Sequence, residues 1–416
     1  MQTDLPQIFA FASNEWHTPW WMARQHLFTR LARRGWPVVY STGPQSLWQR
    51  PSDKWRRGGL LHDFERVETG GDEAVLVDRP GRFLPLWRRE GAWNAFVSER
   101  HAQHLSRDAA ARDRSCIAYL WNPRFWPYVR LLEADYVVYH IHDAWTAEAW
   151  PNGLRRRHRK LVERADLIIA TADNMSRDLP GIGPGGARIL PHGVDFAVVE
   201  AGAMAPCPED LATIPRPRIG YTGRVNLKLD FPLIAEAARR RADLHWIFIG
   251  ATGIGTSYSF NARPEVKADW NLLNRLGNVH FLGVKDRREI PAYLHGCDVL
   301  SLPFSSSYVG FPTKLYEYLA SGKPVVSWNG ENVRPLTHLI ALADGADEWL
   351  SAIDRALAGR APGSPQLRQL AARAEDWDCR TSTLENWLGA LTGSRRPQHS
   401  SSASPTPAAL SLAHRR

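Results

Sequence analysis

Short apolar runs alternate with amphipathic stretches along most of this chain. In the first half, buried strands are predicted at residues 7–13, 38–41, 116–121, 137–141 and 167–170. In the second half, the same pattern predicts strands at 218–222, 245–250, 279–283, 299–303 and 324–328. Helical spacing lies between these runs, for example at 19–34, 231–240 and 287–295. Residues 50–115 are arginine-rich and show less regular spacing.

This alternation predicts an α/β fold with parallel sheets that carry helices on both faces. At 416 residues the chain is too long for one ordinary core. We therefore expect two facing doubly wound, Rossmann-like domains with a ligand cleft between them, because such sheets bind ligands outside the carboxyl ends of their strands.

The predicted organisation has five parts. Residues 1–200 form an acceptor-side domain, and 201–217 form a linker because Pro206, Pro208, Pro215 and Pro217 interrupt regular structure. Residues 218–365 form the second domain, and 366–392 form a helix that packs back toward the first. Residues 393–416 are rich in Ser, Pro and Ala and are expected to be a disordered tail.

Composition restricts the location of the protein. No apolar run approaches the roughly 20 residues that a membrane-spanning helix needs. The first residues carry Asp4 and no basic lead, which is not typical of a signal peptide. The four cysteines show no Cys-x-x-Cys spacing, so neither a disulfide framework nor a zinc site is expected from them. We expect a cytoplasmic protein.

The net charge of +9 suits nucleic acid, an anionic membrane or a phosphorylated substrate. Four of the excess charges, Arg395, Arg396, Arg415 and Arg416, lie in the tail, and this weakens the nucleic-acid interpretation. Six tryptophans lie among many arginines in the first 60 residues, at positions 16, 20, 21, 36, 48 and 55. This mixture suits the inner face of a membrane, stacking on sugars, or an ordinary core with a solvated face.

Two segments in the second half have the chemistry of a diphosphate site. Gly223 follows a predicted strand, and Arg224 and Lys228 would lie at its carboxyl end, where two cations can neutralise a leaving diphosphate. Lys314 and Glu317 lie near a helix start, where lysine suits phosphate and a carboxylate suits ribose hydroxyls. A turn with solvated charges and an ordinary surface Lys/Glu pair are the simpler alternatives.

His140, His142 and Asp143 end a predicted strand of the first half. Strand alternation places the two histidines on one face, so a contact with the donor sugar or the acceptor hydroxyl is expected. A structural histidine is the alternative. The His-x-His spacing also permits a metal, but no third ligand is evident and no metal is expected.

The order of these motifs resembles the GT-B-fold glycosyltransferases of the large bacterial group that builds exopolysaccharide, capsule and lipid-linked glycans. Gly220–Lys228 is similar to their G-x-x-G-R…K segment, and 310–326 to their P-x-K-x-x-E-Y-x-A-x-G-x-P-V-V segment. The sequence Pro-His-Gly-Val-Asp at 191–195 resembles the turn that ends their first domain. Two features differ: Val309 and Gly310 occupy the region of a further glutamate, and Asn14-Glu-Trp-His17 replaces a glycine-rich loop.

The resemblance implies a hexosyltransferase-type enzyme that moves a sugar from a nucleotide-diphosphate sugar to a glycan or lipid-linked acceptor in exopolysaccharide biosynthesis. It implies that Arg224 and Lys228 contact the diphosphate, with His142 and Asp143 as further catalytic candidates. Gly223, Lys314, Leu315 and Glu317 would bind the nucleotide. Retention of configuration without a metal or separate cofactor is implied, and a peripheral membrane location is expected. A nucleotide-sugar epimerase and a basic membrane-binding or nucleic-acid-binding scaffold remain alternatives.

Overall fold

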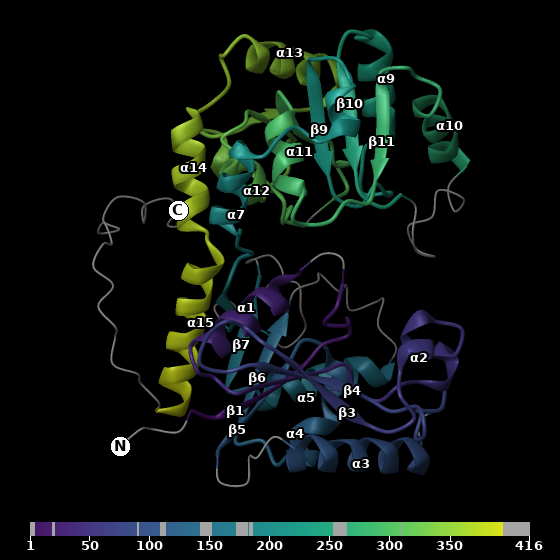
Figure 1. Cartoon of the computed structure of the whole chain (residues 1–416), viewed down its shortest axis with the longest axis vertical. Coiled ribbons are helices and arrows are strands. Elements are labelled where there is room, and N and C mark those ends of the chain that lie inside the picture. Colours follow the sequence, from purple (N-terminus) through teal and green to yellow (C-terminus); the bar gives the residue numbers. More distant parts are fainter. Residues whose placement is uncertain are drawn as a thin grey trace. The chain divides into compact units, whose positions relative to one another are not determined.

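The computed structural model describes residues 5–18, 21–89, 91–108, 114–141, 152–171, 182, 186–252, 264–308 and 310–393. These residues form two compact units (Figure 1). Unit 1 contains the described residues up to His192 together with 378–393, and unit 2 contains Gly193–Trp377.

Unit 1 is built on an eight-stranded sheet in the order β3-β4-β2-β1-β5-β6-β7-β8. Its strands are β1 (Gln7–Phe11), β2 (Val38–Ser41), β3 (Asp63–Val67), β4 (Val75–Arg79), β5 (Cys116–Leu120), β6 (Tyr136–Ile141), β7 (Leu167–Ala170) and β8 (Arg188–Ile189). The pairing is parallel except for β3, which runs antiparallel to β4 at the edge. The predicted strands of the first half are therefore present.

The helices of unit 1 cover both faces of this sheet. They are α1 (Ala23–Arg33), α2 (Asp53–Arg57), α3 (Ala92–Asp108), α4 (Pro127–Leu131), α5 (Asn152–Arg164) and α15 (Trp377–Thr392). Alternate residues of β1, β5 and β6, such as Phe9, Ala118 and Tyr139, join Leu105 of α3 and Leu161 of α5 in one hydrophobic cluster. On the other face, α1 packs with Phe28 against Tyr40 and Tyr119.

The stretch 50–115 is more ordered than its sequence suggested. It contains α2, the antiparallel pair β3–β4 and the long helix α3. Its strands lie at the edge of the sheet, and β3 has an exposed and half-buried pattern rather than an apolar run. Edge strands need less apolar burial than central ones, so their sequence signal is weak.

Unit 2 is built on a six-stranded, all-parallel sheet in the order β11-β10-β9-β12-β13-β14. Its strands are β9 (Arg218–Thr222), β10 (His245–Ile249), β11 (Val279–Gly283), β12 (Val299–Leu302), β13 (Val325–Trp328) and β14 (Ala341–Ala343). Its helices are α7 (Phe196–Ala201), α8 (Glu209–Ala212), α9 (Phe231–Arg240), α10 (Pro264–Leu273), α11 (Ile290–Gly296), α12 (Leu315–Ala320), α13 (Gly345–Leu357) and α14 (Pro365–Ala374).

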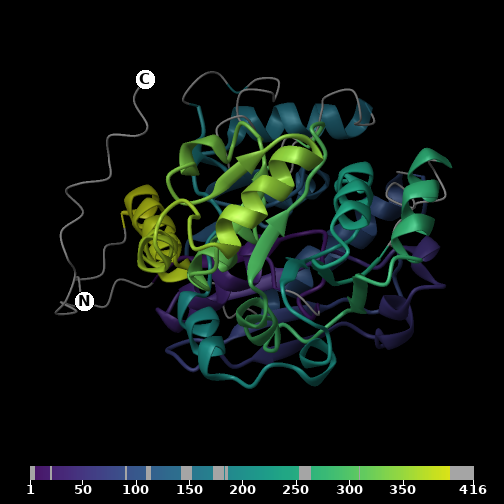
Figure 2. The same ribbon diagram turned by 90° about the horizontal axis from the view of Figure 1, so that it is seen from above.

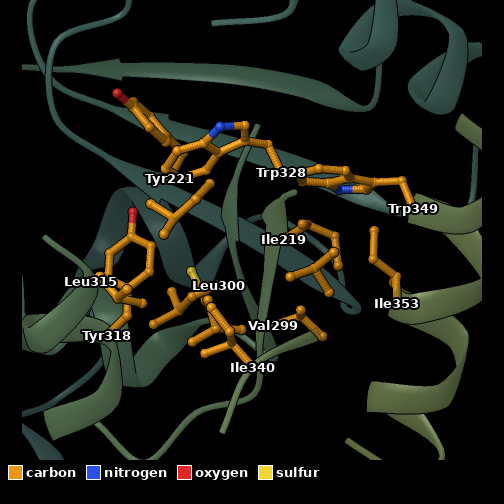
Figure 3. Close-up of a cluster of buried hydrophobic side chains, with 14 of the residues drawn as sticks. Ile219, Tyr221, Val299, Leu300, Leu315, Tyr318, Trp328, Ile340, Trp349 and Ile353 are labelled. Atoms are coloured by element: carbon orange, nitrogen blue, oxygen red, sulfur yellow. The ribbon is translucent and has the colours of Figure 1, made fainter. Parts of the chain in front are cut away.

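Helices lie on both sides of this second sheet (Figures 1 and 2). Right-handed crossovers put α9 and α10 on one face and α11 and α12 on the other, because the strand order reverses after β11. The apolar side chains of β9, β12, α12 and α13 meet in one core cluster, shown in Figure 3. Both units are thus doubly wound α/β structures, as predicted from the alternation.

The segment expected as a linker, 201–217, packs as part of unit 2. It carries α8, and Leu211 and Ile214 are buried against Ile247, Ile249 and Tyr293. The structure instead passes between the units at His192–Gly193 and again at Trp377–Asp378. The prolines correctly predicted an irregular stretch, but the linker prediction was wrong because Leu211 and Ile214 are buried in the core of unit 2.

Residues 366–392 form two helices. The backbone between α14 and α15 bonds to Val194 instead of continuing the helical ladder: the Val194 N–H donates to the carbonyl of Glu375, and the Trp377 N–H donates to the carbonyl of Val194. α15 then packs within unit 1, where Glu385 accepts hydrogen bonds from Arg34 and from the Trp36 indole N–H at 3.1 Å. The tail from 394 onward lies outside the described residues.

Candidate functional site

The carboxyl edge of the unit 2 sheet holds the residues that sequence analysis singled out. β9 lies between β10 and β12, and the chain leaves it in one direction and returns on its other side. This is the switch point of a doubly wound sheet, where the loops after two adjacent strands diverge and leave room for a ligand. The loop after β9 begins at Gly223, and the chain after β12 leads through Phe304 to Lys314.

The loop that carries Arg224 and Lys228 is held at both ends by backbone pairing. The Val225 N–H donates to the carbonyl of Ala251 beyond β10, at 2.9 Å. At the other end, the carbonyl of Lys228 accepts from the Ser305 N–H beyond β12, also at 2.9 Å. The loop is therefore a fixed bridge across the end of β9, and Arg224 and Lys228 are exposed on it.

Two glycines make this close packing possible. Gly223 has φ +125°, and Gly250 at the end of β10 has φ +141°. A Cβ atom at Gly250 would come within 2.2 Å of the carbonyl oxygen of Gly223. Both positions thus need a residue without a side chain, for backbone conformation and for space.

Lys314 lies directly against Gly223. A Cβ atom at Gly223 would lie 2.7 Å from Cε and 2.8 Å from Nζ of Lys314. The Lys314 ammonium donates to the Tyr221 hydroxyl at 3.2 Å and lies over the rings of Tyr221 and Phe304 at 4.7 and 5.2 Å. The aromatic faces favour the cation. The amine therefore lies at the end of β9.

Tyrosine hydroxyls connect these pieces. The Tyr221 hydroxyl donates onward to the carbonyl of Arg224 at 3.0 Å, so it links Lys314 to the loop. Burial raises the pKa of Tyr221 well above its usual range, which keeps this hydroxyl neutral. The Thr222 N–H donates to the Tyr318 hydroxyl at 2.7 Å and thereby fastens α12 to the last residue of β9.

Sequence analysis did not assign a role to Tyr221 or Tyr318. Both lie within the quoted motifs, but their part in the site depends on partners 3 and 96 residues away along the chain. The signal available was their polarity inside otherwise apolar segments, since a buried tyrosine hydroxyl usually has a hydrogen-bond partner. Figure 3 shows both residues in the core cluster.

The charges of Lys314 and Glu317 are both perturbed. Burial lowers the pKa of Lys314 to about 8; Glu317 raises this pKa and Lys228 lowers it. Burial raises the pKa of Glu317 to about 7, while Lys314 lowers this pKa and Asp195 raises it. Both side chains are half-buried. Perturbed titratable groups at the end of a sheet are typical of functional sites.

A pair of stacked rings connects Lys314 to Lys228: Lys314 lies over Phe304, whose ring stacks on that of Tyr308 at 4.4 Å. Lys228 also lies over the Tyr308 ring at 5.4 Å. Arg224 belongs to the same loop, four residues before Lys228. Its carbonyl accepts a hydrogen bond from Tyr221, the tyrosine that also binds Lys314. The three predicted cations therefore belong to one edge of the sheet, where positive charge can meet a diphosphate.

The helix expected to assist through its dipole is short. α12 has six residues, and Lys314 is its N-cap residue rather than part of its first turn. Because so few peptide dipoles align in such a helix, we attribute the attraction for phosphate mainly to the lysine side chains. Glu317 lies within the first turn.

Leu315 was expected to bind the nucleotide, but its side chain is fully buried in the core of unit 2 (Figure 3). Its N–H is bonded to the carbonyl of Pro312 at 2.9 Å. This position contributes the packing that holds the start of α12, and thus Lys314, against the sheet.

The histidine segment of unit 1 divides into two parts. His142 and Asp143 lie outside the described residues. His140 is 1% exposed, its Nδ1 pairs with the Tyr119 hydroxyl at 2.7 Å, and its ring stacks on Trp121. Its burial and its contacts with Tyr119 and Trp121 give His140 a structural role in unit 1. The expected contact of this segment with the donor sugar or the acceptor hydroxyl stays a prediction.

The tryptophans near the N-terminus also divide. Trp16 and Trp36 are core residues, whereas Trp48 is 57% exposed. Among the described residues, no helix is both long and apolar enough to cross a membrane.

Comparison with known proteins agrees with this site. Residues 216–359, which contain the β9 loop and Lys314, match a family model described as "Glycosyl transferases group 1". The matched part of the chain is similar to the group 1 glycosyltransferases, and the chain is a glycosyltransferase. It is also 26% identical over 355 residues to TuaH of Bacillus subtilis (strain 168), which is named for teichuronic acid biosynthesis; the match covers 79% of this chain and 85% of TuaH.

Solved structures show the same fold. This glycosyltransferase is similar to Anabaena HepE in complex with UDP and glucose, with TM-score 0.64 and 15% identity over 93% of this chain and 100% of HepE. It is also similar to sucrose-phosphate synthase from Thermosynechococcus elongatus, with TM-score 0.65 and 16% identity over 94% and 100%. The fold is therefore GT-B, with two Rossmann-like domains, as the motifs implied. The comparisons support a glycosyltransferase rather than the epimerase or the non-enzymatic scaffold.

Proposed function

We propose that unit 2 binds the diphosphate of a nucleotide-sugar donor at the edge formed by Gly223, Lys228 and Lys314. The position of the Lys314 ammonium against Gly223, at the switch point of the sheet, carries this proposal. Gly223 has no side chain, which leaves room for the Lys314 ammonium at the end of β9, where this positive charge can meet a phosphate. HepE was solved with UDP and with UDP-glucose, which supports a donor of this class.

In this proposal the lysines act on the leaving group. As the bond between the sugar and the diphosphate breaks, negative charge grows on the diphosphate, and Lys314, Lys228 and Arg224 stabilise it electrostatically. Glu317 accepts hydrogen bonds from the ribose hydroxyls in its ionised form. The positive charge comes from side chains, so the transfer step needs no separate cofactor. The family resemblance favours retention of the anomeric configuration.

The acceptor belongs to cell-surface polysaccharide biosynthesis in this proposal. The name of TuaH, a teichuronic acid biosynthesis glycosyltransferase, supports this class of pathway. A growing glycan or a lipid-linked glycan is the acceptor that we propose for unit 1, with His142 and Asp143 as candidate contacts.

We further propose that unit 1 meets an anionic lipid surface through an apolar patch. Seven large apolar side chains between residues 47 and 96 are exposed, and we group them as this patch: Leu47, Trp48, Leu60, Leu61, Phe83, Trp87 and Phe96. Leu47, Leu60 and Phe83 share a shallow hollow with Arg50 and Arg82. Exposed apolar groups among arginines are what a membrane interface with anionic lipids attracts. Lipid, rather than nucleic acid, is the polyanion that fits this mixture.

Donor binding is tested by a thermal-shift screen with UDP, GDP, ADP and TDP, each alone and as its sugar conjugates. We expect one nucleotide series to raise the melting temperature, because a ligand that binds the folded state stabilises it. Lys314→Ala should remove most of this shift. It should also lower donor turnover by about 10²- to 10³-fold, as expected for the loss of one group that stabilises a developing anion.

Lys267→Ala is the matched control, since Lys267 is an exposed lysine of α10 in the same unit. It should behave as the wild type. Normal donor binding and turnover in Lys314→Ala would overturn the assignment of the diphosphate to this edge, provided that circular dichroism shows both variants folded.

A further inference from the structure

Three side chains of metal-binding type meet beside β4 of the unit 1 sheet. His62 immediately precedes β3, Asp78 belongs to β4, and His101 belongs to α3. Their ligand atoms, two imidazole nitrogens and a carboxylate oxygen, all lie within 4.8 Å of one another. In the part of the chain that the structure describes, no other group of three His, Cys, Asp or Glu side chains meets in this way.

Both histidines direct Nε2 at the same carboxylate. His62 Nε2 pairs with Oδ1 of Asp78, and His101 Nε2 pairs with Oδ2 at 2.9 Å. The Ser41 hydroxyl also donates to Oδ2. Asp78 and His101 are buried, while His62 is half-buried. The Asp78 carboxylate therefore bonds to side chains from three other segments of unit 1.

Two imidazole nitrogens and one carboxylate oxygen are the ligand set of zinc sites that keep an open position. With bonds of roughly 2.0–2.2 Å, tetrahedral zinc holds its ligand atoms about 3.3 Å apart. His101 Nε2 and Asp78 Oδ2 are 2.9 Å apart, and no two ligand atoms of the cluster are more than 4.8 Å apart, so small movements of the side chains would admit the ion. The ion would replace the two His–Asp contacts by bonds from the same atoms.

The surroundings of His101 suit a metal ligand. Its Nδ1 pairs with the Tyr128 hydroxyl at 2.8 Å, which orients the ring and leaves Nε2 directed at the centre of the cluster. Ligating histidines usually hold their second nitrogen in a hydrogen bond of this kind. In the metal-bound form, Nδ1 would carry the proton and donate to Tyr128.

The cluster borders a cavity of about 360 Å³ within unit 1. His62 and His101 line this cavity, and so do Arg100, His104 and Arg107, beside an apolar wall that includes Leu60 and Phe83. The cavity gives an ion a route of entry and gives its fourth position access to water. The arginines would favour an anion there over a further cation.

We propose that His62, Asp78 and His101 bind a divalent cation of the zinc class, with its open coordination position toward this cavity. The ion would tie β4 and the segment before β3 to α3. The site is made of unit 1 residues alone, and the proposed transfer step does not use it.

The test uses the full-length chain, freed of metal with a chelator and then dialysed. Zinc is titrated in competition with a chromophoric chelator, and bound metal is counted by elemental analysis. We expect one zinc per wild-type chain. His62→Gln and Asp78→Asn should each weaken zinc binding by at least about 100-fold, because each removes a direct ligand rather than an outer partner.

His104→Gln is the matched control, because His104 lines the same cavity and packs its ring against that of His62 at 3.8 Å but supplies no atom to the cluster. It should bind zinc as the wild type does. Asp78 is buried, so Asp78→Asn could fail to fold; His62→Gln, at the half-buried edge, then decides the question. Zinc should raise the melting temperature of the wild type and of His104→Gln but not that of His62→Gln.

Two results would overturn the proposal. The first is wild-type protein that holds no more zinc than His62→Gln, in which case the cluster is a hydrogen-bonded network alone. The second is equal weakening in His62→Gln and His104→Gln, which would place the metal elsewhere.

Discussion

The ammonium group of Lys314 lies 2.8 Å from the point that a Cβ atom of Gly223 would occupy. These two residues are 91 positions apart in the sequence, yet the end of β9 and the start of α12 bring them into contact. Because Gly223 has no side chain, the Lys314 ammonium group can occupy the space beside its Cα atom. The relationship makes glycine a requirement of the proposed donor site, and it leads to a first prediction.

Gly223→Ala should weaken donor binding by at least about tenfold. The new methyl group would displace the Lys314 amine, and the φ of +125° is unfavourable for alanine. The backbone strain alone costs about 1–3 kcal/mol, so the melting temperature should also fall. Isothermal titration with the nucleotide found in the thermal-shift screen measures the affinity.

Gly277→Ala is the control for this change, since a Cβ atom at Gly277 meets nothing within 4 Å. It should leave affinity unaltered. A Gly223→Ala protein that binds donor as tightly as the wild type would contradict the proposed role of the Gly223–Lys314 contact.

The pH dependence of kcat/KM for the donor should be a narrow bell. Glu317, whose pKa is raised to about 7, must lose its proton to accept ribose hydroxyl bonds, so activity should rise through that pH. Lys314, whose pKa is lowered to about 8, must keep its proton to bind the diphosphate, so activity should fall above that pH.

Lys314→Arg separates these two limbs. Arginine stays charged at every accessible pH, so the falling limb of the profile should move to higher pH while the rising limb keeps its pH. If the falling limb keeps its position in Lys314→Arg, then Lys314 is not the group that controls it.

Glu317→Gln should stabilise the protein at alkaline pH while it weakens donor binding. The folded state holds the Glu317 proton more tightly than the unfolded state, because its pKa is raised from 4.5 to about 7. Stability is therefore lost as pH rises through this window, and glutamine removes the loss. The gain in melting temperature should be larger at pH 8 than at pH 5.

Scanning calorimetry at both pH values tests this prediction, with Glu331→Gln as an exposed control from the same unit. A gain of equal size at both pH values would show that the effect is not the ionisation of Glu317. Binding sites often contain groups, such as a buried carboxylate, that lower the stability of the folded protein but are needed for function.

The apolar patch of unit 1 should carry membrane binding. We expect the wild type to float with vesicles that contain anionic lipid at low salt, and Trp48→Ser/Phe83→Ser to float several-fold less, since Trp48 and Phe83 are 57% and 73% exposed. Leu367→Ser/Leu370→Ser, which removes two exposed leucines of α14 in unit 2, should float as the wild type does. Wild-type protein that stays in solution at low salt would remove the support for this surface.

Much of unit 2 could be predicted from local pattern. The strands Arg218–Thr222 and Val279–Gly283 and the helix Phe231–Arg240 occur with the predicted bounds. Buried strands and amphipathic helices each have a characteristic hydrophobic pattern over a few neighbouring residues, so they can be predicted locally. Gly223, Lys314 and Glu317 could be found for a related reason: each stands within a short motif whose neighbours define its conformation.

Other features depended on residues far apart in the chain. The role of Tyr318 needs Thr222, and the burial of Trp36 needs Glu385 of α15. His62, Asp78 and His101 are separated by irregular sequence, so their meeting could not be predicted from spacing. The exposure of the first tryptophans was likewise decided by packing, since Trp16 and Trp36 entered the core and Trp48 did not.

The amino-acid sequence by itself determined that the chain forms two doubly wound α/β units and that cations follow the strand ends of the second. It did so because hydrophobic period and glycine placement act over a few residues. Only the tertiary structure decided which charges become neighbours, since burial and desolvation depend on the whole fold. The contact of Lys314 with Gly223, the raised pKa of Glu317 and the His62–Asp78–His101 cluster all arise at that level.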